Sequence, residues 1–132
     1  MRVIDASALA KYVNREPGWK NVEKYLLEGC ITVDLAIKEV ANTIWKRYLK
    51  KELSNSDAYK LYKSFIENLM VKVTRQENIL DNAFKIAIKH RCTLYDALYI
   101  ALAKKENSEL ITSDKKQRNT AESEGIKTIY IP

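Results

Sequence analysis

The stretch TLYDALYIALA, residues 93–103, decides the fold of this chain. It contains no Gly or Pro and is apolar at nearly every position, so it predicts a helix that is buried all round. Such a helix lies at the centre of a domain, with other elements packed around it. Its one charged side chain is Asp96, in the first turn. Because a buried charge is tolerated only when it is paired or binds a metal, Asp96 is a candidate functional residue.

Asp96 also has a purely structural explanation. Thr93 and Asp96 have the spacing of a capping box, in which a hydroxyl at the helix start accepts a backbone N–H three residues on. An acid in the first turn also complements the positive end of the helix dipole. This position alone therefore leaves both explanations open.

Short apolar runs and helical patterns alternate along the rest of the chain. Strands are predicted at residues 2–5, 30–33, 70–73, 110–112 and 127–131. Helices are predicted at residues 8–13, 17–28, 35–51, 54–69, 78–89, 94–104 and 115–123, with Ser7 as the N-cap of the first and Pro17 in the first turn of the second. This alternation predicts an α/β protein, a single three-layer α/β/α sandwich over residues 1–132 with a short, mainly parallel central sheet.

Two of the predicted helices carry unusually wide apolar surfaces. In the helix at 35–51, one stripe consists of Ile37, Val40, Ile44 and Tyr48, and a second consists of Ala41, Trp45 and Leu49. We expect the second stripe to be buried between two subunits of a homodimer. The helix at 54–69 has the most regular apolar face, which consists of Ala58, Leu61, Tyr62, Phe65, Ile66 and Leu69.

Acidic residues stand where strands end. In an open parallel sheet, ligands bind in the crevice beyond the carboxyl ends of the strands. Asp5 ends the first predicted strand and Asp114 follows the strand at 110–112, although each could simply cap the next turn or helix. Glu39 lies opposite the first apolar stripe of its helix, so periodicity alone favours a solvated glutamate.

Four short motifs occur in a characteristic order. They are Asp5-Ala6-Ser7 after a strand, Glu39-Val40-Ala41-Asn42 on a helix, Thr93-Leu94-Tyr95-Asp96 opening a helix, and Thr112-Ser113-Asp114 after a strand. In this order and spacing they resemble the PIN domain, and more narrowly the VapC-type toxins of prokaryotic toxin–antitoxin pairs. The resemblance extends over essentially the whole chain.

The resemblance implies an endoribonuclease that depends on one or two Mg²⁺ or Mn²⁺ ions, forms a homodimer and is blocked by an antitoxin. It assigns catalysis and metal binding to Asp5, Glu39, Asp96 and Asp114. Two carboxylates about 5 Å apart repel by about 3 kcal/mol at an effective dielectric near 20, so four converging acids call for a cation. We expect Asp5 and Asp96 to bind the first ion, and Glu39 and Asp114 to bind a second ion or orient water.

Ser7, Asn42 and Thr112 are expected to support these acids, although Ser7 could equally be a simple cap and Asn42 a surface amide. Some relatives carry additional acids beyond the fourth motif, and this chain has Gln117, Arg118 and Asn119 there.

The chain has 23 Lys and Arg against 17 Asp and Glu, a formal net charge of +6. This balance suits an RNA substrate, and it is equally compatible with an ordinary Lys-rich surface. The basic residues near predicted strand ends, which are candidate RNA contacts, are Lys11, Arg75, Lys115, Lys116 and Arg118. No apolar run is long enough to span a bilayer and no signal peptide is evident, so we expect a cytoplasmic protein. Cys30 and Cys92 are isolated and are expected to be small apolar residues in a reducing compartment.

The remaining candidates favour structure over function. His90 is expected at the surface or as a helix cap, and Tyr12, Tyr95 and Tyr99 are expected to be buried rather than to stack on bases. A haloacid-dehalogenase-type phosphatase needs a second acid where this chain has Ser7, and a receiver domain needs an acidic pair that is absent. Two alternatives stay open: an RNA-processing or DNA-cleaving PIN nuclease with no toxic role, and a catalytically idle PIN fold that binds RNA or protein.

Overall fold

The sheet has five strands, all parallel, in a computed structural model that describes residues 1–132. The strands are β1 (Arg2–Ile4), β2 (Cys30–Val33), β3 (Val71–Thr74), β4 (Leu110–Thr112) and β5 (Thr128–Tyr130), and they are ordered β3-β2-β1-β4-β5. β1 is central, and its Val3 lies opposite Ile31 of β2 and Leu110 of β4. The chain therefore builds the sheet outward from β1 in both directions.

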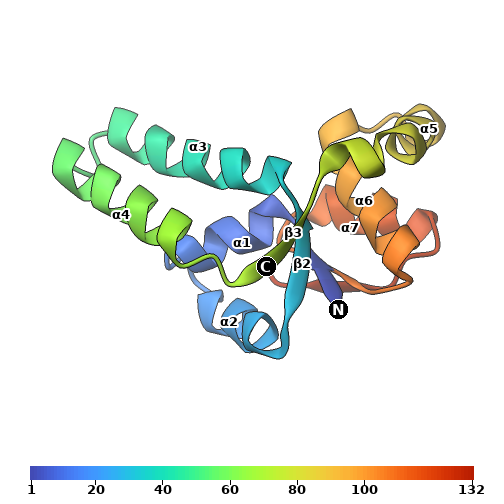
Figure 1. The fold of residues 1–132 in the computed structure, drawn as a ribbon, viewed down its shortest axis with the longest axis horizontal. Coiled ribbons are helices and arrows are strands. Elements are labelled where there is room, and N and C mark those ends of the chain that lie inside the picture. Colours follow the sequence, from blue (N-terminus) through green and yellow to red (C-terminus); the bar gives the residue numbers. More distant parts are fainter.

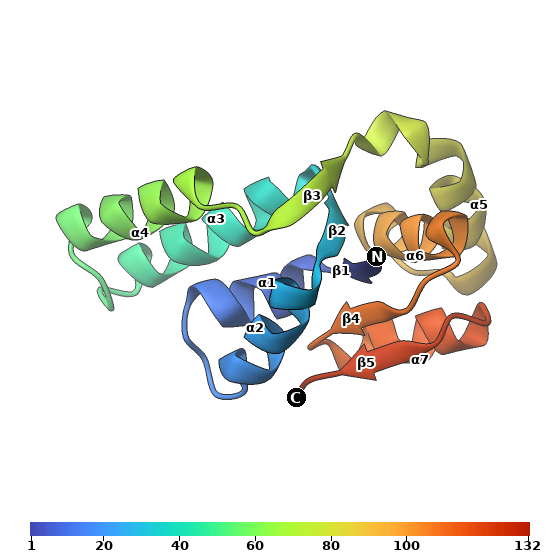
Figure 2. The same cartoon turned by 60° about the horizontal axis from the view of Figure 1, so that its bottom comes forward.

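Helices cover both faces of the sheet. One layer holds α1 (Ala6–Val13), α2 (Trp19–Glu28), α3 (Leu35–Leu49) and α4 (Asn55–Glu67), and the other holds α5 (Leu80–His90), α6 (Leu94–Glu106) and α7 (Lys115–Ser123) (Figures 1 and 2). Right-handed crossovers between parallel strands put the helices of the two sheet halves on opposite faces. The predicted three-layer α/β/α sandwich is confirmed.

The core forms around α6, as the apolar pattern of residues 93–103 predicts. Every residue from Ala97 to Ala103 is buried, and so are Val3 and Ile4 of β1 beneath them. Burying a Val, Leu or Ile side chain contributes about 1.5–3 kcal/mol, so this helix and the central strand contribute strongly to the stability of the sandwich. No helix, α6 included, combines the length and apolar content that crossing a bilayer requires.

Three predicted helix starts are wrong by a few residues. Asp5, not Ser7, is the N-cap of α1, because its carboxylate accepts the backbone N–H of Ala8. Pro17 lies before α2 in a turn, and the N-cap of α2 is Gly18 at φ +95°, where a Cβ would also come within 3.3 Å of the Pro132 carbonyl oxygen. The helix expected from residue 78 begins at Leu80, after the short 3₁₀ turn Gln76–Asn78.

The apolar face of the helix at 54–69 is buried to different degrees along its length. Phe65 is buried and Ile66 packs partly buried against the core, whereas Tyr62 and Leu69 of the same face are 37% and 36% exposed. Helices α3 and α4 form a hairpin that extends beyond the sheet, and α4 packs mainly on α3 (Figure 1). The regular periodicity of α4 therefore reflects helix-to-helix packing with an exposed remainder.

The prediction that His90 lies at the surface or caps a helix is wrong. Its side chain is only 14% exposed, and Nε2 lies 2.6 Å from Oε1 of Glu124. Glu124 also binds the Nζ atoms of Lys104 at 2.6 Å and Lys89 at 3.2 Å. The hydrogen bonds from Lys104 and His90 lower the pKa of Glu124 to about 2. One carboxylate at the end of α7 thus ties α5, α6 and α7 together.

Replacing this carboxylate should destabilise the fold in a pH-dependent way. The folded-state pKa of Glu124 is depressed, so its contribution is complete above the unfolded pKa near 4.5 and is lost as pH falls toward 2. We expect Glu124→Gln to lower the free energy of unfolding by about 1–2 kcal/mol at pH 7, since its lysine partners are partly solvated. Urea denaturation should show this difference shrinking below pH about 4. The exposed Glu106→Gln is the matched control, and an equal loss there would refute the assignment.

Candidate active site

The structure brings the four predicted acids together around one cavity. Asp5, Glu39, Asp96 and Asp114 all line a space of about 280 Å³, to which α1, α3, α6 and the β4–α7 turn contribute. It lies beyond the carboxyl ends of β1 and β4, where the strand order of the sheet reverses. This is the position at which open parallel sheets bind ligands. The other lining residues are Ala6, Ser7, Ala10, Asn42, Thr43, Lys46 and Tyr99.

Asp5 is the most enclosed of the four acids. The residue is 4% exposed, and three donors satisfy its carboxylate: Ser7 Oγ at 2.6 Å and Ala8 N at 3.0 Å to Oδ1, and Thr112 Oγ1 at 2.5 Å to Oδ2. Burial raises the pKa of Asp5 to about 6, because it outweighs these hydrogen bonds. The β1–α1 turn therefore holds a carboxylate whose ionisation is costly without a cation.

Ser7 and Thr112 hold Asp5 in place and join two turns of the chain. Their hydroxyls lie 3.2 Å apart, and each accepts a backbone N–H from the β4–α7 turn: Ser113 N to Ser7 Oγ at 2.9 Å and Asp114 N to Thr112 Oγ1 at 3.1 Å. Both residues were predicted as supporting groups. The network fixes the distance between the ends of β1 and β4, and so between Asp5 and Asp114.

Asp96 and Asp114 have structural positions and still line the cavity. The backbone N–H of Asp96 donates to Thr93 Oγ1 at 3.1 Å, as a capping box predicts. Asp114 is the N-cap of α7 and accepts the N–H groups of Lys116 and Gln117 at 2.8 and 3.2 Å. Burial, and after it the charge of Asp114, raises the pKa of Asp96. A capping role and a role in the cavity are therefore not exclusive at these two positions.

Glu39 is not the solvated glutamate that helical periodicity favours. Its carboxylate lines the cavity and accepts a 2.5 Å hydrogen bond from the hydroxyl of Tyr99. Burial raises the pKa of Glu39, and the nearby charge of Asp96 raises it further. Tyr99 of α6 therefore shields Glu39 from water, whereas Asn42 and Lys46 on the same polar edge of α3 are exposed.

Tyr99 belongs to the site, although the sequence favoured a merely buried tyrosine. It is 2% exposed, and burial together with its bond to Glu39 raises the pKa of its phenol above the usual value. The available signal was its spacing from Asp96, because residues three apart share a helix face. The same signal applies to Thr43 and Lys46, which follow Glu39 at helical spacing and also line the cavity. Asn42, predicted as a supporting residue, lies on this edge too.

The five basic residues proposed as RNA contacts do not line the cavity. Lys11 donates to the Pro17 carbonyl at 3.2 Å, Arg75 pairs with Glu77 at 3.3 Å, and Arg118 lies over the ring of Tyr130. Of the five, Lys116 is the one whose charge acts on the site. It lowers the pKa of Asp96 and so offsets part of the rise that burial causes. Lys115 is exposed at the start of α7.

Gln117 stands where some relatives carry an additional acid. Its side chain is 2% exposed, and its Nε2 donates to the backbone carbonyl of Asp96 at 2.8 Å. Gln117 therefore anchors α7 to the first turn of α6 and does not enter the cavity.

The donor set of the cavity fits a hydrated divalent cation. Burial raises the pKa of three acids, Asp5, Glu39 and Asp96, so ionising them together is costly without a further cation. No three acidic, His or Cys side chains converge into a closed metal cage. Mg²⁺ does not require one, because it keeps several waters and takes one or two carboxylates from the protein.

Comparison with known proteins identifies related chains. The family model described as the PIN domain matches residues 2–123. Ribonuclease VapC3 of Pyrobaculum aerophilum is 35% identical over 116 residues, which are 86% of this chain and 88% of that protein.

Solved structures show the same fold at lower identity. PAE2754 of Pyrobaculum aerophilum superposes with a TM-score of 0.74 at 22% identity, covering 96% of this chain and 87% of that one. A toxin–antitoxin complex from Klebsiella pneumoniae has a TM-score of 0.66 at 15% identity, with 89% and 90% covered. VapC20 of Mycobacterium tuberculosis, a toxin that cleaves the sarcin–ricin loop, has a TM-score of 0.66 at 13% identity, with 90% and 94% covered.

The raised pKa of Asp5 predicts how the stability of the metal-free protein depends on pH. A carboxyl whose folded pKa is raised stabilises the fold below its unfolded pKa near 3.8, and this contribution is lost as pH rises through about 6. We expect wild-type protein in EDTA to lose about 3 kcal/mol between pH 4 and 7 from this group. Asp5→Asn should lack this loss in urea denaturation, because an amide still caps α1.

The exposed Asp57→Asn serves as the matched control and should keep the wild-type pH profile. An Asp5→Asn protein whose stability falls with pH as steeply as wild type would contradict the burial of a charged Asp5.

Proposed function

Because the chain belongs to the PIN domain family, we propose that it is a Mg²⁺- or Mn²⁺-dependent endoribonuclease, acting in the cytoplasm as the toxin of a toxin–antitoxin pair. The observation that carries this proposal is the single cavity lined by Asp5, Glu39, Asp96 and Asp114. The 35% identity to Ribonuclease VapC3 supports RNA as the substrate.

In the proposed mechanism, the protein positions groups around a phosphodiester. Asp5 and Asp96 would hold the first ion, and Glu39 and Asp114 would hold a second ion or orient the attacking water. When bound, divalent ions would polarise the phosphate, lower the pKa of water and stabilise the leaving oxygen. Ser7 and Thr112 keep the Asp5 carboxylate in one orientation through hydrogen bonds of 2.6 and 2.5 Å. Tyr99 does the same for Glu39 at 2.5 Å.

Among the alternatives, the buried acids argue against a catalytically idle binding module. A surface that only binds RNA has no use for several carboxylates with raised pKa values, which repel the phosphate backbone. An RNA-processing or DNA-cleaving nuclease without a toxic role would use the same site. The fold shared with a toxin–antitoxin complex supports an antitoxin partner. A neighbouring reading frame for a small DNA-binding protein separates a toxin from a housekeeping nuclease.

Cleavage of a mixed RNA pool tests the proposed activity. Wild-type protein should cleave RNA with Mg²⁺ or Mn²⁺ and stop when EDTA is added. Asp96→Asn should lower the rate at least about a hundredfold, since it removes a carboxylate from the metal site. Its metal-free stability should be unchanged or higher, because one member of a like-charge cluster is neutralised. Mapping the cut sites then defines the target sequence.

Asp57→Asn is the control and should cleave like wild type. Cleavage that persists in EDTA, or full activity in Asp96→Asn, would overturn the proposal. If Asp96→Asn lost more than about 1 kcal/mol of stability and still cleaved RNA, the role of Asp96 would be helix capping alone. A matching single-stranded DNA pool distinguishes the DNA-cleaving alternative.

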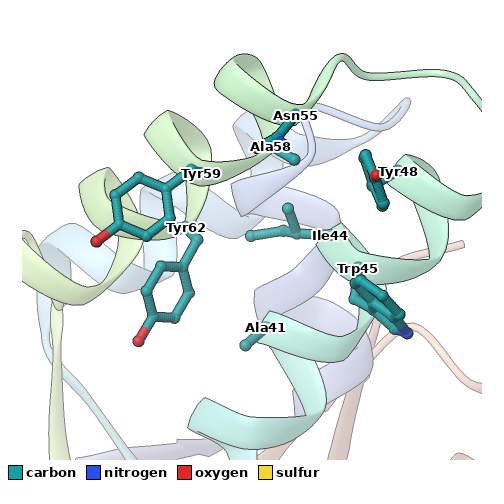
Figure 3. A pocket seen from close by; sticks show the side chains of 8 residues that line it. All are labelled: Ala41, Ile44, Trp45, Tyr48, Asn55, Ala58, Tyr59 and Tyr62. Atoms are coloured by element: carbon teal, nitrogen blue, oxygen red, sulfur yellow. The ribbon is translucent and has the colours of Figure 1, made fainter.

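We also propose that the α3–α4 hairpin carries a homodimer interface. Its outer side has an apolar groove of about 350 Å³, lined by Ala41, Ile44, Trp45, Tyr48, Asn55, Ala58, Tyr59 and Tyr62 (Figure 3). Trp45 is 53% and Leu49 57% exposed, and the rings of Trp45 and Tyr48 stack with centroids 5.6 Å apart. A second copy placed by a twofold axis would bury the predicted stripe Ala41, Trp45 and Leu49 on both chains.

Light scattering tests the dimer. Wild-type protein should have the mass of two chains at micromolar concentration, and Trp45→Glu should have the mass of one, because a charge replaces an apolar contact. Leu27→Glu is the matched control, since Leu27 is 73% exposed on α2 and should leave the mass unchanged. A wild-type monomer at this concentration would refute the interface.

A further inference from the structure

One edge of the carboxylate cavity is a polar stripe of α3. Glu39, Asn42, Thr43 and Lys46 all line the cavity, and their spacing of three, four and seven residues puts them on one helix face. Lys46 stands two turns, about 10 Å, along the helix axis from Glu39. It is the one cationic side chain among the lining residues. The cavity therefore has a strongly acidic part and, further along α3, a basic margin.

The ammonium group of Lys46 is uncommitted. Several other cations of this chain lie within ion-pair distance of a carboxylate, as Lys104 does with Glu124 at 2.6 Å, whereas Lys46 forms no ion pair. The adjacent Arg47 is occupied, because it donates to Asn14 and lies 3.3 Å from Glu52. All three ammonium donors of Lys46 are thus available to a ligand.

The other two polar groups on this edge of α3 differ in whether they form hydrogen bonds within the protein. Thr43 Oγ1 donates to the Val40 carbonyl at 2.7 Å and accepts from Asn14 Nδ2 at 2.9 Å, so it holds α3 against α1. The exposed Asn42 amide makes no hydrogen bond within the protein and lies one turn from Lys46. Lys46 and Asn42 together offer charged and neutral donors on one side of the cavity.

We propose that Lys46, assisted by Asn42, forms a phosphate-binding subsite for the RNA strand. This subsite receives a backbone phosphate next to the one that lies among the carboxylates. The inference rests on the proposed ribonuclease function and adds the path of the substrate, which leaves the acidic part of the cavity along α3. An acidic cavity repels a polyanion, so a cation at its margin is needed to hold the strand while the metal site engages one phosphodiester.

The competing explanation is that Lys46 serves as a counterion for the carboxylates. No carboxylate, Glu39 and Asp96 included, lies within ion-pair distance of Lys46. A counterion role predicts that loss of Lys46 changes metal affinity, whereas a phosphate subsite predicts that it changes RNA affinity.

Lys46→Gln tests the subsite, with Lys38→Gln as the matched control, because Lys38 is an exposed lysine on the same helix that does not line the cavity. For an oligoribonucleotide, we expect Lys46→Gln to raise KM about threefold to tenfold while kcat stays within about twofold. Binding measured by fluorescence anisotropy in EDTA should show a log Kd versus log salt slope that is smaller by about 0.7, the value for one lost contact to single-stranded RNA.

Lys46→Arg should restore KM, and the melting temperature and the Mn²⁺ concentration for half-maximal cleavage should be unchanged in all three variants. Equal KM and salt slope in Lys46→Gln and Lys38→Gln would overturn the proposal, and so would a shift in Mn²⁺ requirement without a change in RNA affinity. A wild-type protein that does not cleave RNA would instead refute the ribonuclease function. The binding measurement without metal still tests the subsite in that case.

Discussion

Burial of a carboxylate at the end of the central strand is the constraint on which the site depends. Asp5 leaves β1 at the point where the strand order reverses, and α6 covers the same strand from one side. Three hydrogen bonds to its oxygens offset only part of the cost of desolvation, which is why its pKa rises to about 6. The fold thus holds an ionisable group in a state that a cation would relieve.

The same residues that shape the local structure form the site. Asp5 and Asp114 cap α1 and α7, and the N–H of Asp96 is capped by Thr93. A cap puts a carboxylate at a helix N-terminus, and in this topology the N-termini of α1 and α7 follow two adjacent parallel strands. Capping therefore brings acids together at one edge of the sheet. Asp5 and Asp114 cap helices and line the cavity at the same time, so the two explanations do not exclude each other.

Helix α3 has three faces with different roles. Val40 and Ile44 are buried and hold the helix on the sandwich, Glu39 and Lys46 line the cavity, and Trp45 is exposed on the α3–α4 hairpin. A helix that is used on all sides cannot show a single clean stripe, which explains why its sequence pattern was ambiguous. It also links the proposed subunit contact to the site through one rigid element.

The sequence by itself determined the order of strands and helices, the central place of α6 and the strand-end positions of Asp5 and Asp114, because these follow from local periodicity and capping. Only the tertiary structure decided that Glu39 meets Tyr99, that His90 is enclosed beside Glu124, and that the apolar face of α4 is only partly covered. Each of these depends on which distant element covers a given helix face. Helical periodicity shows that one face of a helix differs from the opposite face, but it does not show which element packs against that face.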